Sequence, residues 1–401
     1  MMSCQKGQPM IPSILPTYNR APLSFASGSG SWLTTDDGRR FLDLGAGIAV
    51  NSLGHAHPEL VAALAAQAGQ LWHTSNLYVI PAQQKLADQL VDLTFADTVF
   101  FTNSGTESCE LAVKMARKYF YDKGRPDRVE IITFEGSFHG RSSAGIAAAG
   151  SEKMTKGFGP LLSGFVHVPF GVHDPLHVAV SDKTAAVMIE PIQGEGGIRQ
   201  VPDHCLKGLR DFCDSHGILL IFDEVQCGVG RSGKLFAHEW AGIEPDIMMV
   251  AKGIGGGFPI GAVLATQEAA SGMTAGTHGS TYGGNPLGCA VGSAVLEHVA
   301  DPAFLSDVNR KAGLMRQGLE GLAAQFPKVF DGVTGSGLML GLKCRANNID
   351  VVNAGYVAEV LTVPAAENVV RILPALNILD DDIKAAFLRL EAAALIVQSS
   401  K

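Results

Sequence analysis

One lysine, Lys252, occupies a position where an amine can do chemistry. It follows the apolar run Ile247 to Ala251 and precedes a glycine-rich turn. Poor solvation disfavours the ammonium form, so such a lysine has a neutral amine available near neutral pH. A neutral amine that faces a cavity can condense with an aldehyde to form a Schiff base. Taken alone, however, a lysine after a hydrophobic run is more often a solvated charge at a strand end.

A carboxylate occupies a similar position upstream, since Asp223 ends the apolar run Ile218 to Phe222. Together, a lysine and an aspartate at the ends of two neighbouring strands would suit pyridoxal 5'-phosphate (PLP). The lysine could bond to the aldehyde, and the aspartate could hold a proton on the pyridine nitrogen. Just after the aspartate, Val225 could pack on the ring face and Gln226 could donate to the phenolate oxygen.

Two segments could bind the anionic groups of a ligand. The segment Asn103 to Glu107 lies between a predicted strand, 98–101, and a predicted helix, 108–121. Free backbone N–H groups and the helix dipole at such a junction make an anion site, which Gly105 would let a ligand approach closely. An ordinary helix cap is an equally good interpretation. The loop His278 to Pro286 has hydroxyl groups between glycines, which suits either phosphate and carboxylate binding or a surface turn.

Two further loops follow predicted strands. In the first, Phe138 could stack on a flat ring, and Arg141 presents a planar fork that matches a carboxylate. A packed phenylalanine and a solvated arginine are the commoner interpretations of each residue alone. In the second, Glu190 and Glu195 lie among glycines, and both need cations or water because buried carboxylates are costly.

The elements that must position these loops alternate along the chain. A hairpin is expected at 31–44, around the turn Asp36-Asp37-Gly38. The alternation predicts an α/β fold with a mainly parallel sheet covered on both faces. The last hundred residues read as a smaller α+β unit with a strand at 337–343, after a boundary near 290–310. The other predicted strands are 98–101, 129–134, 184–189, 218–222, 247–250 and 261–265, and the predicted helices include 58–68, 82–93 and 108–121.

Composition bounds the classes of function. The chain has 401 residues, 46% of them hydrophobic, which allows a large core and two or more domains. A net charge of −8 without a basic patch argues against nucleic acid as a partner. We expect no membrane span, because the apolar runs are broken, and the first residues lack the pattern of a signal peptide. Seven cysteines, Cys4 among them, without a C-x-x-C argue against zinc or a disulfide framework and favour a reducing cytoplasm.

Two motifs suggest other chemistry. The run Gly228 to Gly233 matches the dinucleotide pattern G-x-G-x-x-G, which would indicate a nicotinamide-dependent oxidoreductase. It lies past the midpoint of the chain, and no good helix opens at its third glycine, so this alternative is the weaker one. His55 and His57 could suggest a metal pair, but no third ligand is near, and we expect no metal site.

In their order along the chain, these segments resemble the class III, fold-type I PLP-dependent aminotransferases, and within that class the acetylornithine aminotransferase group. The resemblance runs from about Tyr18 to Leu379. It implies a large domain, 51–295, with a mostly parallel seven-stranded-type sheet, and a smaller α+β domain built from 1–50 and 296–401. The matching phrases are Gly47–His55, Asn103–Glu107, Gly230–Glu239, His278–Pro286, Leu361–Pro364 and Val370–Pro374.

The resemblance also implies roles for single residues. Lys252 matches the lysine that carries PLP and moves the proton, and Asp223 matches the partner of the pyridine nitrogen. The further cofactor-binding positions are Gly105, Thr106, Phe138, Val225, Gln226 and Thr281. The implied substrate-binding positions are Tyr18, Arg141, Glu195, Ser280 and Arg371.

The implied activity is transfer of the terminal amine of N2-acetyl-L-ornithine to 2-oxoglutarate, in arginine biosynthesis. Arg141 would bind a carboxylate, and Glu195 would mask Arg371 for the amine donor and release it for 2-oxoglutarate. Thr281 would reach the phosphate of the neighbouring subunit's cofactor, which implies a homodimer with active sites at the interface. Ornithine, succinylornithine, succinyldiaminopimelate and 4-aminobutyrate remain open as donors, as does a PLP-fold protein without catalysis.

Overall fold

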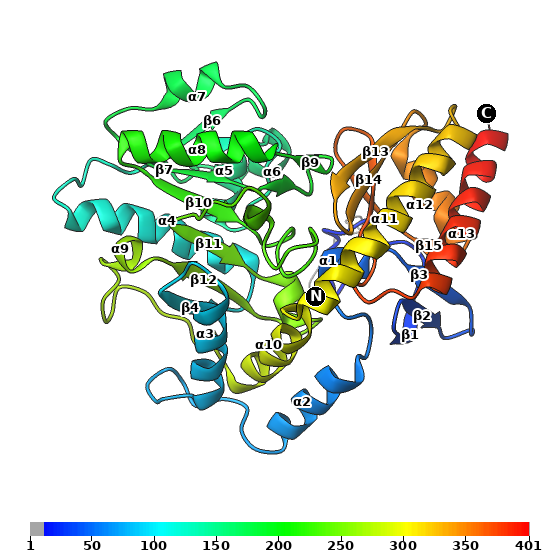
Figure 1. Ribbon diagram of the computed structural model, residues 1–401, viewed down its shortest axis with the longest axis horizontal. Coiled ribbons are helices and arrows are strands. Elements are labelled where there is room, and N and C mark those ends of the chain that lie inside the picture. Colours follow the sequence, from blue (N-terminus) through cyan, green and yellow to red (C-terminus); the bar gives the residue numbers. More distant parts are fainter. Residues whose placement is uncertain (1–11, 401) are drawn as a thin grey trace, which may run out of the picture.

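The computed structural model describes residues 12–400, so Cys4 lies outside the described residues. Figure 1 shows a larger lobe that contains the central sheet and a smaller lobe that contains strands from both ends of the chain. Within residues 12–400, no helix is long and apolar enough to cross a membrane.

The larger lobe is built on a seven-stranded sheet. Only β12 runs antiparallel to its neighbours, so the sheet is mainly parallel, as expected. The apolar runs that end at Asp223 and Val250 are fully buried central strands, which fits a sheet covered on both faces. The edge strand β6 was missed by the sequence analysis. In order across the sheet, the strands are β4 (Thr98–Thr102), β12 (Gly261–Ala265), β11 (Ile247–Val250), β10 (Leu219–Asp223), β7 (Thr184–Ile189), β5 (Glu130–Phe134) and β6 (Phe165–Val168).

Alternate residues of the strands face different helices. Ile221 of β10 packs in the cluster of the helix α4 (Gly105–Asp122), whereas its neighbours Leu220 and Phe222 pack in the cluster of α8 (Asp203–His216). This follows from the two-residue period of a strand. Both faces are therefore covered, and the carboxyl edge of the sheet is left for a site. The helices α3 (Pro81–Leu93) and α10 (Pro286–Val299) pack together beside β4 and β12.

The start of α4 differs from the expectation of a helix over 108–121. The helix begins three residues earlier, because Ser104 has an extended backbone and its side chain caps the N–H of Glu107. Gly105 and Thr106 therefore belong to the first turn of a helix, where the backbone N–H groups have no acceptor within the helix.

The smaller lobe joins both ends of the chain. The expected hairpin forms from β2 and β3, and the short strand β15 pairs in parallel with β3. This pairing agrees with a small domain made from both termini, while the bounds 1–50, 51–295 and 296–401 stay a prediction. The first sheet contains β1 (Phe25–Ser29), β2 (Trp32–Thr35), β3 (Arg40–Asp43) and β15 (Val360–Leu361). The second contains β13 (Phe330–Ser336), β14 (Met339–Cys344), β17 (Val369–Ile372) and β16 (Val363–Ala365).

Three helices cover these small sheets, and the remaining elements are short or connect the lobes. The covering helices are α11 (Pro302–Gln325), α12 (Asn348–Val357) and α13 (Asp380–Ser399). The others are α1 (Ala46–Ala49), α2 (Pro58–Ala68), α5 (Ser143–Ala149), α6 (Glu152–Thr155), α7 (Asp174–Ala179), α9 (Gln267–Ala270), β8 (Ile192–Gln193), β9 (Arg199–Gln200), and the 3-10 helices η1 (Ala237–Trp240) and η2 (Lys252–Gly255).

Candidate active site

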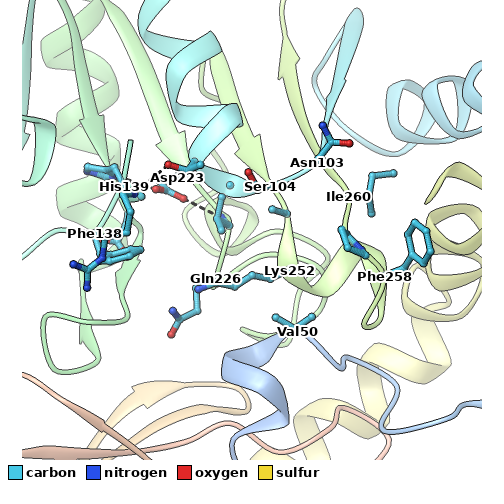
Figure 2. A pocket seen from close by; sticks show the side chains of 18 of the residues that line it. Val50, Asn103, Ser104, Phe138, His139, Asp223, Gln226, Lys252, Phe258 and Ile260 are labelled. Atoms are coloured by element: carbon cyan, nitrogen blue, oxygen red, sulfur yellow. Dashed lines mark hydrogen bonds and ion pairs between the residues drawn. The ribbon is translucent and has the colours of Figure 1, made fainter. Parts of the chain in front are cut away.

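A cavity of about 460 Å³ lies at the carboxyl ends of the central strands. Its volume is in the range of small-molecule sites, and its position is the one that open α/β sheets use for ligands. Figure 2 shows side chains from several elements that point into it. The lining residues are Val50, Asn103–Thr106, Phe138–Arg141, Glu190, Asp223, Val225, Gln226, Ala251, Lys252 and Gly257–Ile260.

Lys252 opens η2 directly after β11 and is only partly buried at the cavity wall. Its backbone is left-handed, with φ of 46°, which is uncommon for a residue with a side chain. Burial lowers its pKa, and the charge of Arg371 lowers it further, although Asp223 acts in the opposite direction. The direction agrees with the expected neutral amine, because both main causes disfavour the ammonium form.

Asp223 has a buried partner that the sequence analysis missed. His139 Nδ1 lies 2.7 Å from Asp223 Oδ2, and the N–H of Val225 donates to Asp223 Oδ1 at 3.0 Å. Burial lowers the pKa of His139, but the hydrogen bond and charge of Asp223 outweigh this effect and raise it overall. The imidazole therefore donates to the carboxylate and fixes its orientation. The only feature of the sequence that could have indicated a role for His139 is its position next to the predicted site residue Phe138.

Glu190 lies buried beside this pair. Its carboxyl oxygens accept from the backbone N–H groups of Phe138 at 2.9 Å and Gly194 at 3.2 Å. Burial and the charge of Asp223 raise the pKa of Glu190 to about 7. The sequence analysis expected a cation or water beside this glutamate. Within residues 12–400 no Lys or Arg forms an ion pair with it, and two backbone N–H groups bind its oxygens instead.

The amino end of α4 meets the cavity at Gly105 and Thr106. A Cβ on Gly105 would lie 2.8 Å from Val225 Cγ1, so only glycine fits without displacing the valine. Thr106 Oγ1 accepts from the N–H groups of Arg141 and Ser142, each at 3.1 Å. This ties the helix start to the loop that carries Phe138 and Arg141.

A second arginine reaches the site from the smaller lobe. Arg371, on β17, is almost fully buried, and its Nη2 forms an ion pair with Glu195 Oε1 at 2.8 Å. Its Nη1 donates to Gln226 Oε1 at 3.5 Å, and its Nη2 also donates to the carbonyl oxygen of Pro364. The two residues predicted to open and close are therefore in direct contact, and Gln226 joins Arg371 to the cavity wall.

Besides Glu195 and Arg371, which reach the cavity wall through Gln226, three predicted site residues do not line the cavity of this chain. Tyr18 is 73% exposed and lies beside Arg20, and Thr281 is exposed. Ser280 touches the cavity only indirectly, because its Oγ accepts from the side chain of Asn103 at 3.3 Å. Any role of these residues therefore needs either a second subunit or movement of the chain.

The motifs set aside in the sequence have structural partners. His55 Nε2 lies 2.8 Å from Asp43 Oδ2, and the ring of His57 packs edge-on against His298. The run Gly228 to Gly233 forms turns, and the next helical residues start only at Ala237. Among the residues with described positions, no group of three or more His, Cys, Asp or Glu could hold a metal ion.

The residues of the cavity fit the cofactor expected from the sequence. An amine, a fixed carboxylate, an aromatic ring and a helix amino end lie around one space, from Lys252, Asp223, Phe138 and α4. The first backbone N–H groups of α4 have no acceptor within the helix, so they are available to an anion. A phosphorylated aldehyde with a basic ring nitrogen matches each of these groups.

Known proteins resemble this chain over its whole length. The family model described as "Aminotransferase class-III" matches residues 16–394. An acetylornithine aminotransferase of Rhodobacter capsulatus is 67% identical over 97% of this chain and 99% of its own. The crystal structure of the ornithine aminotransferase from Toxoplasma gondii superposes with a TM-score of 0.93 at 29% identity, over 97% of this chain and 94% of that one. An N-acetylornithine aminotransferase from Stenotrophomonas maltophilia gives a TM-score of 0.85 at 38% identity, over 96% and 98%.

Proposed function

Because the chain belongs to the class III aminotransferases, we propose that it moves the terminal amine of N2-acetyl-L-ornithine to 2-oxoglutarate. The products are N-acetyl-L-glutamate 5-semialdehyde and L-glutamate, in a step of arginine biosynthesis. Class III aminotransferases use PLP, which is the cofactor of this enzyme. The observation that carries the proposal is one cavity lined by Lys252, Asp223 and Arg141, with Arg371 joined to its wall through Gln226.

The residues of the chain divide the chemical work. When bound, PLP supplies an aldehyde for the amine and a ring that accepts electrons from the carbon next to it. The Lys252 amine, whose pKa is lowered by burial, would take the proton from the amine-bearing carbon of the donor and pass it to the aldehyde carbon of the cofactor. Asp223, held by His139, would keep a proton on the ring nitrogen. The first N–H groups of α4 would hold the phosphate.

Two arginines would allow the enzyme to bind two kinds of substrate. Arg141, at the exposed mouth of the cavity, would bind the carboxylate of the amine donor. Arg371 is covered by Glu195 and would bind 2-oxoglutarate once the glutamate moves away. The Glu195 side chain is 40% exposed and faces solvent, whereas Arg371 stays buried, so the glutamate is the partner that would move. Alternation of the two substrates on one cofactor makes the reaction ping-pong.

The proposal includes a homodimer with active sites at the subunit interface. Large apolar side chains are exposed in the segment 71–79, with Leu77 84% and Val79 86% exposed. Asn76 in this segment donates to the carbonyl oxygens of Ser280 and Gly283 in the loop that carries Thr281. An exposed apolar surface next to a predicted cofactor-binding threonine is what a partner subunit would cover.

A reducing cytoplasm is our proposed compartment. The six cysteines within the described part of the chain are all free, and five of them are buried. Such thiols persist where disulfides do not form.

A panel of amines tests the substrate. Each half-reaction is followed by the loss of cofactor absorbance with N2-acetylornithine, ornithine, succinylornithine, succinyldiaminopimelate or 4-aminobutyrate. We expect the highest kcat/KM with N2-acetylornithine, and a higher value for another amine would reassign the donor. Borohydride treatment should fix the cofactor on the peptide that contains Lys252, and K252A should lose both the label and turnover. Turnover by K252A near the wild-type rate would contradict the proposed role of Lys252.

A further inference from the structure

We propose that Arg231 is a positioning residue that fixes the strand carrying Arg371 against the larger lobe and so sets the affinity for the dicarboxylate acceptor. The inference rests on the proposed function, because that function assigns the acceptor to Arg371. Arg231 lies in the turns that follow β10, outside the cavity lining, and it takes no part in the chemistry described above.

Arg231 spans the two lobes with its side chain and its backbone. Its Nη1 donates to the carbonyl oxygen of Leu338 at 3.1 Å and to that of Pro374. Its own carbonyl oxygen accepts from the N–H of Leu338 at 3.0 Å. One residue of the larger lobe therefore holds two separate segments of the smaller lobe.

Both segments lead directly to Arg371. Leu338 immediately precedes β14, and Gly341 of that strand is the pairing partner of Arg371 on β17. Pro374 follows the end of β17 by two residues. The guanidinium group thus bonds to the residue before β14 and to the segment after β17. A shift of either strand would move Arg371 relative to the cavity.

The charge of Arg231 is unusual for a residue with a purely packing role. Its side chain is 2% exposed, and no carboxylate within residues 12–400 forms an ion pair with it. Burial lowers its pKa to about 9, which leaves it cationic at neutral pH. A buried cation held only by carbonyl oxygens is costly. Both hydrogen bonds come from Nη1, which lies farther from Cα than a lysine ammonium would, and the reach of this nitrogen to two carbonyl oxygens gives a geometric reason to retain arginine.

The contact is also tight on the side of the smaller lobe. Gly337, in the turn between β13 and β14, has a left-handed backbone with φ of 57°. A Cβ at this position would overlap the backbone of Arg231 and Ser232. The turn therefore sits directly on the residue that holds it, and an added methyl group would push the two lobes apart at this point.

Two variants disturb this contact from opposite sides. R231K keeps the charge but draws the donor nitrogen back from the carbonyl oxygens of Leu338 and Pro374, and G337A forces the turn away from Arg231. R310K is the matched control, because Arg310 forms an exposed ion pair with Asp380 within the smaller lobe and lies away from β17. Each purified holoenzyme is examined by hydrogen–deuterium exchange of the peptide 369–377 and by the two half-reactions, measured separately.

We expect faster exchange in 369–377 for R231K and G337A. The apparent affinity for 2-oxoglutarate should fall on the order of tenfold, as for loss of one charge-assisted hydrogen bond. The half-reaction with the amine donor, which does not use Arg371, should stay within roughly twofold of wild type. R310K should match wild type in all three measurements. An equal loss in both half-reactions, or unchanged exchange in 369–377, would overturn the proposal.

Two further outcomes are also decisive. If R231K does not fold, the exchange of 369–377 and the two half-reactions of G337A decide whether the proposal holds. If the wild-type enzyme does not react with 2-oxoglutarate, the proposed function has failed, and the exchange of 369–377 in the variants still decides whether Arg231 positions the strand.

Discussion

His139 Nδ1 lies 2.7 Å from Asp223 Oδ2, and both side chains are almost fully buried. The pair lies in the wall of the cavity, and the hydrogen bond fixes the carboxylate before any ligand enters. Glu190 faces the same pair and completes a cluster of three titratable groups. The predictions that follow concern this cluster and its surroundings.

Replacing His139 should weaken cofactor binding. H139N removes the ring nitrogen that bonds to the Asp223 carboxylate, and loss of a hydrogen bond to a charged group costs about 1.5–3 kcal/mol. We expect the Kd for PLP to rise about tenfold or more, measured by titration of the apoprotein. H167N is the control, because His167 bonds to the carbonyl oxygen of Ala147 outside the cavity. Equal Kd values for H139N and wild type would show that the imidazole does not support Asp223.

Glu190 should make the stability of the apoprotein depend on pH. Its pKa is raised to about 7 in the folded protein, from 4.5. The folded state then binds the proton more tightly than the unfolded chain, so the stabilisation is present below pH 4.5 and is lost as pH rises through 7. Position 190 does not titrate in E190Q. Relative to this variant, the free energy of unfolding of the wild type should fall by on the order of 3 kcal/mol between pH 4.5 and 7. Thermal unfolding of both proteins at several pH values measures the difference, and a difference independent of pH would refute it.

Adding a methyl group at Gly105 should disturb the phosphate end of the site. In G105A the new Cβ would meet Val225 Cγ1 at 2.8 Å and push this lining residue into the cavity. We expect weaker binding of PLP and of inorganic phosphate by the apoprotein, with recovery in the double variant G105A/V225A because the clash is removed. G208A is the control, since no atom lies near its added Cβ. Failure of V225A to restore binding would show that the clash is not the cause.

Neutralising Glu195 should shift the balance between the two substrates. In E195Q the charge attraction across the 2.8 Å contact with Arg371 is lost, so the guanidinium is held less tightly and is released more easily to the acceptor. The KM for 2-oxoglutarate should fall several-fold, and the KM for the amine donor should rise, because an uncovered cation then faces it. Initial rates with each substrate varied give both values. A parallel change in both KM values would argue against the masking role.

The sequence by itself determined the local elements and predicted the catalytic groups. The apolar runs before Asp223 and Lys252 predicted two buried strands, and both strands form at the expected places. A strand or a helix depends on the pattern of a short window of residues, and this pattern is fully present in the chain. The helix start at Gly105 was placed late, because the cap by Ser104 is a detail of backbone geometry.

Only the tertiary structure decided which side chains meet. His139 and Asp223 are 84 positions apart, and Arg231 lies 143 positions from Pro374. No window of sequence contains both members of either pair, because their contact depends on strand order and on how the two lobes pack. The sequence therefore predicted the groups that we propose act on a substrate, whereas the fold decided which buried partners hold them in place, since hydrogen-bond geometry exists only between positioned atoms.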